Sequence, residues 1–220
     1  MRKTHLFILI VIAFNLFTWA QEKQIEVTDI YQGAFGTEGM DALRSMNNGK
    51  QYTVLNMDRM NRSTMIDKYD YKTLNKVSTI VSSADLNDIP YFSAYSFSAD
   101  EKKILLSTEV EPIFRRSTLG IFYVYDVDSK KAVRISNTKI QEPTLSPDGK
   151  QVAYVNDNNI YLFNIATGKT IQVTTDGVRN KIINGVTDWV YEEEFAFVRA
   201  FEWNADGSKI AFLRFDETNV

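Results

Sequence analysis

The sequence of 220 residues contains no cysteine and only one histidine, His5. Without cysteine, the chain has no disulfide, no thiol nucleophile and no thiolate metal site. Because His5 lies so close to the start, the rest of the chain cannot build a Ser-His-Asp triad, a Cys-His pair or a histidine-ligated zinc site. The Gly-x-Ser-x-Gly pattern of serine hydrolases is also missing. We therefore expect no catalytic residue, no metal site, no cofactor and no hydrolytic activity of this chain alone.

The chain also lacks an excess of basic residues. It has 25 lysines and arginines against 28 aspartates and glutamates, a net charge of −3. A protein that binds nucleic acid needs a basic face to neutralise phosphates. The composition therefore argues against a nucleic-acid partner.

Residues 1–20 have the pattern of a cleavable signal peptide. Two basic residues precede the apolar run Leu6–Trp19, and Ala20 ends a plausible cleavage site. The alternative is a membrane anchor, but the run is shorter than the roughly 20 residues needed to span a bilayer. No cysteine follows that could carry a lipid. We expect a secreted or periplasmic mature chain that begins near Gln21 and has a net charge of −5 once the two basic residues are removed.

One turn motif repeats along the rest of the chain. Residues 145–154 and 203–212 match position for position, with an Asp-Gly turn followed by an alternating strand. Residues 97–106 are a third copy with Glu in the Gly position, and residues 46–52 are a weaker fourth. This is the chemistry of a β-hairpin, so we assign these turns a structural role and no catalytic one.

A second repeated hairpin alternates with the first, at residues 70–77, 123–135 and 161–173. Two hairpins per unit make four strands, and units of this content are typical of propeller blades. We predict an all-β fold: a partial β-propeller of about three to four four-stranded antiparallel blades, the last of which begins at Trp203. Because a propeller normally needs at least four blades, residues 21–220 are expected to be part of a longer propeller domain.

Residues 184–195 differ from the blade pattern, because three adjacent glutamates, 192–194, lie among aromatic residues. Thr187 or Asp188 could cap a short helix near 188–195. In a strand, Glu193 and Glu194 would point to opposite faces, whereas in a helical turn they lie about 100° apart. The residues alone leave three readings open: a solvated acidic turn, an ammonium site, or a calcium site.

The same segment closely resembles the Asp-Trp-Val-Tyr-Glu-Glu-Glu signature of the dipeptidyl peptidase IV family of serine peptidases. The resemblance extends over residues 96–220 and more faintly back to Ile25. It implies the N-terminal part of an eight-bladed propeller, which an α/β-hydrolase domain follows in the family. We expect that catalytic domain to be absent from this chain. The family removes dipeptides from peptide N-termini and prefers proline or alanine as the second residue.

The resemblance also implies a substrate site. The second and third acids of the triplet, Glu193 and Glu194, would bind the free amino group of the substrate, and no role passes to Glu192. The segment 111–117 looks like the family insertion that supplies an arginine to substrate carbonyl groups. Its aromatic-Arg-x-Ser pattern gives that role to Arg115, with Arg116 as the alternative.

The resulting hypothesis is a substrate-gating propeller fragment of a secreted dipeptidyl peptidase IV-like serine exopeptidase. Its partners would be peptides with a free N-terminus and the hydrolase domain of the full-length protein, and the resemblance allows a homodimer. One alternative is a non-catalytic propeller that serves as a binding scaffold. Another is a sister peptidase, such as an oligopeptidase or acylaminoacyl peptidase, which would have no need for the paired glutamates.

Overall fold

The structure, a computed structural model, describes residues 24–37, 39 and 42–220. The predicted signal peptide, residues 1–20, lies outside the described residues. The chain divides into two units, residues 1–40 and 41–220. The described element of the first unit is the short helix α2, Val27–Tyr31, which begins after Glu26. In the described part of the chain, no helix has the length and apolar character needed to cross a membrane.

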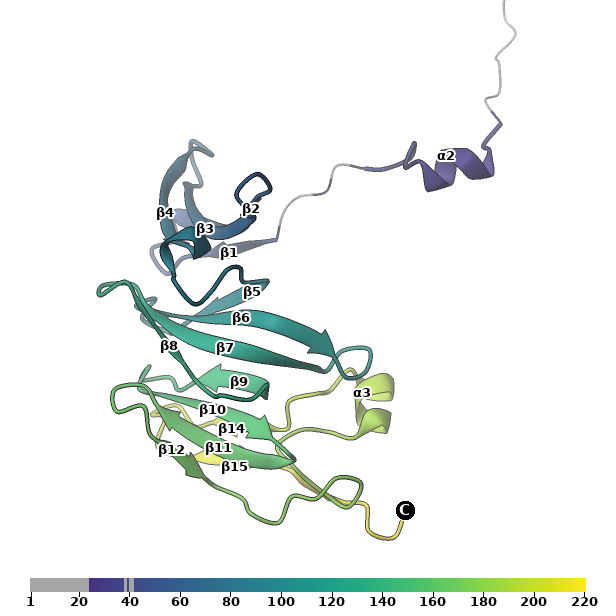
Figure 1. Cartoon of the computed structure of the whole chain (residues 1–220), viewed down its shortest axis with the longest axis vertical. Helices are drawn as coiled ribbons and strands as arrows, with labels where there is room; N and C mark the ends of the chain where they lie inside the picture. Colours follow the sequence, from purple (N-terminus) through teal and green to yellow (C-terminus); the bar gives the residue numbers. More distant parts are fainter. Residues whose placement is uncertain (1–23, 38, 40–41) are drawn as a thin grey trace, which may run out of the picture. The chain divides into compact units, whose positions relative to one another are not determined.

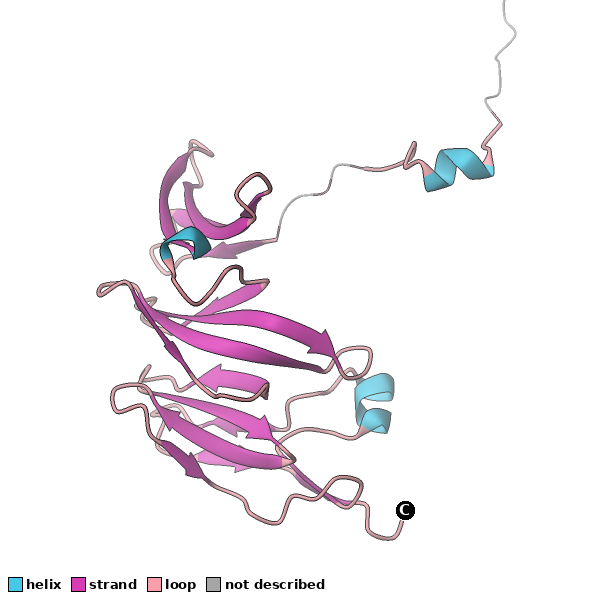
Figure 2. Ribbon diagram, viewed as in Figure 1, coloured by secondary structure: helices cyan, strands magenta, loops and turns pink. Residues whose placement is uncertain are grey.

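The second unit is built from antiparallel sheets, as Figures 1 and 2 show. The first four-stranded sheet contains β1 (Leu43–Ser45), β2 (Gln51–Asp58), β3 (Ser63–Asp70) and β4 (Lys76–Ser82), followed by the 3₁₀ helix η1 (Ser83–Asp85). The second contains β5 (Ala94–Phe97), β6 (Lys103–Pro112), β7 (Thr118–Asp126) and β8 (Lys131–Arg134). The third contains β9 (Gln141–Leu145), β10 (Gln151–Asn156), β11 (Asn159–Asn164) and β12 (Thr170–Gln172). In each sheet the strands pair in sequence order, so the predicted partial propeller of four-stranded blades is confirmed.

The blades stack because their middle strands are apolar on both faces. On β7, Ile121, Tyr123 and Tyr125 belong to a cluster shared with the first blade, whereas Phe122 and Val124 belong to a cluster shared with the third. This alternation follows from the two-residue period of a strand. The strands of a blade that is buried on both faces are therefore continuous apolar runs.

The predicted hairpin turns are present, with Gly149 and Gly207 in the left-handed region at φ 67° and 72°. Glu101, which replaces Gly in the third copy, adopts the same region at φ 59°. A non-glycine residue is disfavoured there. The Glu101 carboxylate also accepts a hydrogen bond from the backbone N–H of Asn47, in the equivalent turn of the first blade. This bond gives the Glu101 side chain a partner on the neighbouring blade, which a Gly at this position could not provide.

The last part of the chain departs from the predicted four-stranded pattern. It forms two two-stranded sheets, which pair β13 (Ile182–Asn184) with β16 (Arg214–Asp216) and β14 (Phe201–Trp203) with β15 (Ile210–Phe212). Only Leu213 separates β15 from β16. Its backbone N–H donates to the carbonyl of Ala200, next to β14, and its carbonyl accepts from the N–H of Gly185, next to β13. The chain thus changes partner strand at Leu213, where the segment between β13 and β14 leaves the sheet.

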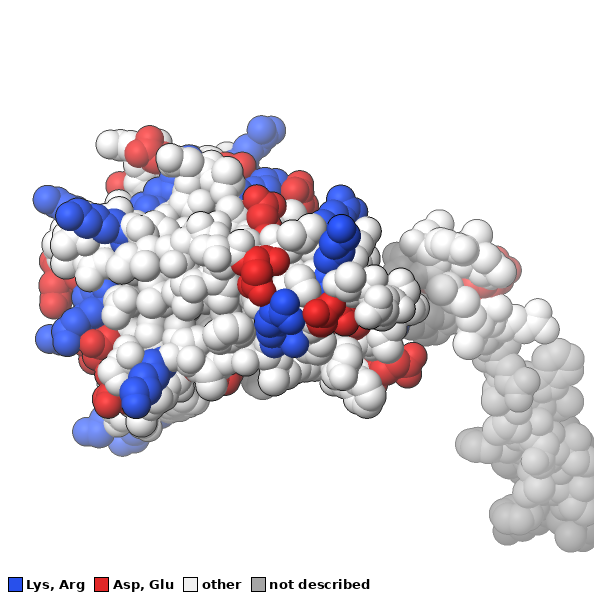
Figure 3. Space-filling model, turned by 90° about the horizontal axis from the view of Figure 1, so that it is seen from below, with Lys and Arg blue, Asp and Glu red and all other residues white. Residues whose placement is uncertain are grey.

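Charged side chains are dispersed over the face shown in Figure 3, where basic and acidic residues lie near one another. No continuous patch of one sign forms on that face.

Candidate functional site

The acidic signature lies on an excursion from the sheet, formed by residues 185–200 between β13 and β14. The base of this excursion is closed by hydrogen bonds between its two arms. The Thr187 backbone N–H donates to the Val198 carbonyl at 3.1 Å, and the Thr187 hydroxyl donates to the Phe197 carbonyl at 2.6 Å. These bonds hold the two arms of the excursion together where it leaves the sheet, and so they fix the position of its tip.

The tip of the excursion is the helix α3, Trp189–Phe195, which confirms the predicted helix near 188–195. Asp188 caps its N-terminus, because its carboxylate accepts a hydrogen bond from the Tyr191 backbone N–H at 2.9 Å. Ala196 ends the helix in the left-handed region at φ 54°. Tyr191 packs on Phe215 with ring centroids 5.1 Å apart, which ties α3 to β16.

The second part of the site is the loop that joins β6 to β7. These two strands run past the other strands of their blade, pairing Glu111 with Leu119 beyond a bulge. A hydrogen bond from the Ile113 N–H to the Ser117 carbonyl, at 2.9 Å, joins the two ends of the loop. Figure 1 shows the tip of this hairpin beside α3. The segment 111–117, which resembles the family insertion, is therefore the tip of a lengthened hairpin that lies beside the acidic helix.

Glu192 joins the two parts. Only 1% of this residue is exposed. Its Oε1 atom accepts hydrogen bonds from the backbone N–H groups of Arg116 at 2.6 Å and Ser117 at 2.9 Å. Burial by itself raises the pKa of Glu192, but these hydrogen bonds outweigh it and hold the pKa below its ordinary value. Glu192 is therefore an ionised, buried acceptor for the loop.

Glu193 and Arg115 form a second link. The Arg115 Nε atom lies 3.0 Å from Glu193 Oε2. The Glu193 side chain is 15% exposed and the Arg115 side chain is 71% exposed. The structure thus brings together two of the three predicted site residues, which lie far apart in the sequence.

Glu194 is exposed, and its carboxylate makes no hydrogen bond or ion pair with the described residues. Helix geometry places it about 100° from Glu193. The convergence of both carboxylates on one ligand remains a prediction. Arg116 is exposed and contributes its backbone N–H to the link with α3. Between the two candidate arginines, the structure pairs the side chain of Arg115 with the acidic triplet.

Comparison with known proteins identifies the family. The sequence model described as "Dipeptidyl peptidase IV (DPP IV) N-terminal region" matches residues 98–220, more than half of the chain. The chain belongs to the dipeptidyl peptidase IV N-terminal region family. This match includes the β6–β7 loop and α3, which carry the residues described above.

Individual relatives agree with this assignment. The chain is 33% identical over 193 residues to a probable dipeptidyl-aminopeptidase B of Neurospora crassa, covering 84% of this chain and 20% of that protein. It is 33% identical over 173 residues to dipeptidyl aminopeptidase B of Saccharomyces cerevisiae, covering 78% and 20%. The crystal structure of Porphyromonas gingivalis dipeptidyl peptidase 4 matches with a TM-score of 0.78 and 37% identity, covering 89% of this chain and 28% of that one. The chain spans about a fifth of the length of the curated relatives it matches.

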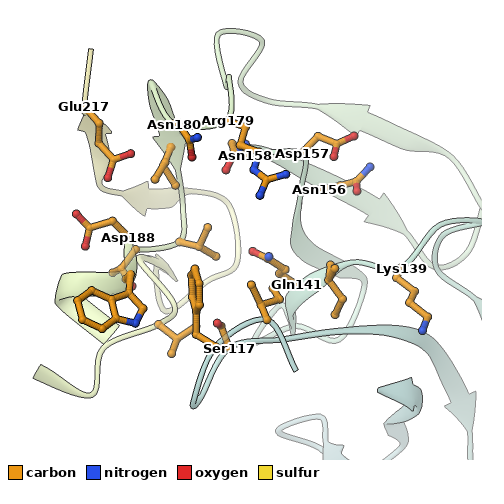
Figure 4. Close-up of a pocket in the computed structure, with 18 of the residues that line it drawn as sticks. Ser117, Lys139, Gln141, Asn156, Asp157, Asn158, Arg179, Asn180, Asp188 and Glu217 are labelled. Carbon is orange, nitrogen blue, oxygen red and sulfur yellow. The ribbon is translucent and has the colours of Figure 1, made fainter. Parts of the chain in front are cut away.

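In this dipeptidyl peptidase IV N-terminal region, a cavity of about 680 Å³ adjoins the β6–β7 loop and the start of α3. Figure 4 shows Asp188 and Glu217 on one side of it and Lys139 on the other. Burial raises the pKa of Glu217, and the neighbouring carboxylate of Asp188 raises it further. Arg115, Glu193 and Glu194 do not line this cavity, so it is adjacent to the candidate site and distinct from it.

Sequence reasoning missed two features of this region. It gave no role to Glu192, whose partners are backbone groups 76 and 75 residues away. It also did not single out Glu142, which lies close enough to Arg199 and Glu192 for their charges to affect it. The pKa of Glu142 is raised above its ordinary value. Burial is the largest cause and the charge of Glu192 adds to it, and together they outweigh the Arg199 guanidinium, which acts to lower this pKa. No sequence motif marks Glu142. Glu192 lies within the acidic signature, and the run of three acids could have prompted a search for a buried member.

Proposed function

We propose that this chain is the N-terminal propeller portion of a secreted dipeptidyl peptidase IV-like serine exopeptidase and that it anchors the free N-terminus of a peptide substrate. The observation that supports this most directly is the 3.0 Å contact between Arg115 on the β6–β7 loop and Glu193 on α3. The family supplies the reaction class, and the names of the relatives give dipeptidyl peptidases.

The chemistry of the residues fits an ammonium group. A peptide ammonium has three N–H donors and no acceptor, so it is best bound by carboxylates. Glu193 uses one oxygen toward Arg115, which leaves the other oxygen available, and Glu194 is exposed one residue further along α3. Arg115 is largely exposed and donates from several N–H groups, so it can also bind a carbonyl oxygen of the substrate.

Such an anchor acts as a ruler. It holds the N-terminus at a fixed distance from a nucleophile on a partner hydrolase domain, so that two residues fit and blocked N-termini are rejected. We place this role outside the cytoplasm, following removal of residues 1–20. The proline or alanine preference of the family would then apply to the second residue of the substrate.

The test compares two peptides that differ only in their amino group. The full chain is titrated with the tripeptide Ala-Pro-Ala and with N-acetyl-Ala-Pro-Ala, and binding is followed by the NMR shifts of backbone amides. We expect the free peptide to bind at least about tenfold more tightly, because acetylation removes a charge-assisted hydrogen bond. Equal affinity for both peptides would contradict the anchor and favour a scaffold role.

A further inference from the structure

We infer that Glu192 is a positioning residue of the site: its buried carboxylate fixes the β6–β7 loop so that Arg115 meets both Glu193 and the substrate. This inference rests on the proposed function, because it concerns how Arg115 is held in place for a peptide. It assigns a role to Glu192, the one acid of the triplet to which the family resemblance gives no substrate contact.

The contacts that support it are short and buried. Glu192 Oε1 lies 2.6 Å from the Arg116 nitrogen and 2.9 Å from the Ser117 nitrogen, and Glu192 is 1% exposed. These two donors directly follow Arg115 in the sequence. Whatever fixes the backbone at Arg116 also fixes the point from which the Arg115 side chain starts.

Arg115 needs such a support. Its side chain is 71% exposed, so packing constrains it little, and its polar partner in the structure is Glu193. A long, exposed side chain loses considerable rotamer freedom when it is held in one position. A backbone that is already fixed leaves less freedom to lose when the peptide binds. Consecutive residues of α3 thus hold consecutive residues of the loop, Glu192 through the backbone and Glu193 through the side chain.

A purely structural role for Glu192 would have a different signature. It would lower the stability of the chain but would not depend on whether Arg115 is present. A positioning role makes the two residues act through one contact, so their effects on binding should not add. The experiment therefore combines both substitutions.

The variants are Glu192→Ala, Glu192→Gln, Arg115→Ala and the double variant Glu192→Ala/Arg115→Ala, each in the full chain. Glu111→Ala is the matched control, since it removes an exposed carboxylate from the same hairpin. The Glu111 carboxylate pairs with Lys139 and not with α3. Each variant is titrated with Ala-Pro-Ala, and the backbone amides of residues 116 and 117 are followed by NMR shift and hydrogen exchange. Glu192→Gln keeps the size and an acceptor oxygen. If the alanine variant does not fold, this variant decides the test, because a loss of binding well above threefold with unchanged exchange protection at residues 116 and 117 would overturn the inference.

We expect Glu192→Ala to weaken peptide binding about as much as Arg115→Ala does, on the order of tenfold, and the double variant to be no weaker than Arg115→Ala. Glu192→Gln should lie within about threefold of the original chain, because the amide oxygen still accepts a hydrogen bond, and the control should be unchanged. The amides of residues 116 and 117 should lose exchange protection only in the alanine variants at position 192.

Two results would overturn the inference. One is unchanged peptide affinity in a folded Glu192→Ala variant. The other is a double variant whose loss equals the product of the two single losses. In either case the proposed function survives if Glu193→Ala still abolishes the preference for a free over an acetylated N-terminus. If Glu193→Ala leaves that preference intact, the proposed function itself is wrong, which distinguishes the two failures.

Discussion

Glu194 offers a clean test of the ammonium anchor, because the fold does not depend on its charge. The residue is exposed, and its carboxylate has no polar partner among the described residues. Glu194→Gln keeps the shape of the side chain and removes one negative charge. The free energy of unfolding should therefore change by no more than about 0.5 kcal/mol, as for other surface substitutions.

The effect on peptide binding should be larger than the effect on stability. A hydrogen bond to a charged acceptor contributes about 1.5–3 kcal/mol, against about 0.5–1.5 kcal/mol for a neutral one. The difference, about 1–1.5 kcal/mol, corresponds to a loss of about five- to tenfold in affinity. The loss should be specific for Ala-Pro-Ala, since N-acetyl-Ala-Pro-Ala has no ammonium to lose.

The assay is a titration of both peptides into the original chain and the variant, with Asp128→Asn as the control. Asp128 is an exposed carboxylate in the turn between β7 and β8, so this control removes the same charge elsewhere. The pH dependence adds a second criterion. A peptide amine has a pKa of about 8, so binding of the free peptide should weaken as the pH rises above that value. If Glu194→Gln binds Ala-Pro-Ala as tightly as the original chain does, Glu194 is not part of the anchor.

Three further outcomes follow from the structure. The full chain should not hydrolyse a chromogenic Gly-Pro amide, because it has no histidine beyond His5; turnover that a serine-directed inhibitor abolishes would refute this. Asp188→Ala should lower the free energy of unfolding by about 1 kcal/mol through loss of the helix cap. It should also lower the pKa of Glu217 in an NMR titration, and an unchanged Glu217 pKa would contradict the interaction between the two carboxylates. Although burial raises the pKa of Asp67, hydrogen bonds from Lys76, Asn56 and Thr79 hold it below the ordinary 3.8. The stability that Asp67 contributes is therefore present above pH 3.8 and lost as the pH falls through its folded-state pKa. In urea unfolding at several pH values, Asp67→Asn should reduce the decline of the free energy of unfolding at low pH. The same decline in the variant and the original chain would contradict this role of Asp67.

The blades could be predicted from the sequence because their signals are local. An Asp-Gly turn needs a left-handed residue, and Gly149 and Gly207 supply it within four residues of each strand. The apolar runs of β6 and β7 indicate strands that are buried on both faces. The helix α3 was also foreseeable, because Asp188 is a good cap and acids suit a first turn.

Other features could not be predicted, because they depend on partners distant in the sequence. The change of partner at Leu213 consists of two backbone bonds, one to Ala200 beside β14 and one from Gly185 beside β13, and backbone groups leave no mark on residue identity. Glu192 is the same case, since its two partners are backbone N–H groups on another blade. From the sequence, the three glutamates of the triplet could be told apart only by a family resemblance.

The geometry of α3 separates the three glutamates. Successive residues of a helix point about 100° apart, so three adjacent carboxylates reach three different environments, which limits their mutual repulsion. Glu192 points into the protein and is matched by two backbone N–H groups, and Glu193 is matched by the Arg115 guanidinium. Glu194 has no such partner among the described residues, so its charge remains available. A cation that binds here would meet one free carboxylate next to a second that Arg115 already holds in place, and this is an arrangement that suits a peptide ammonium.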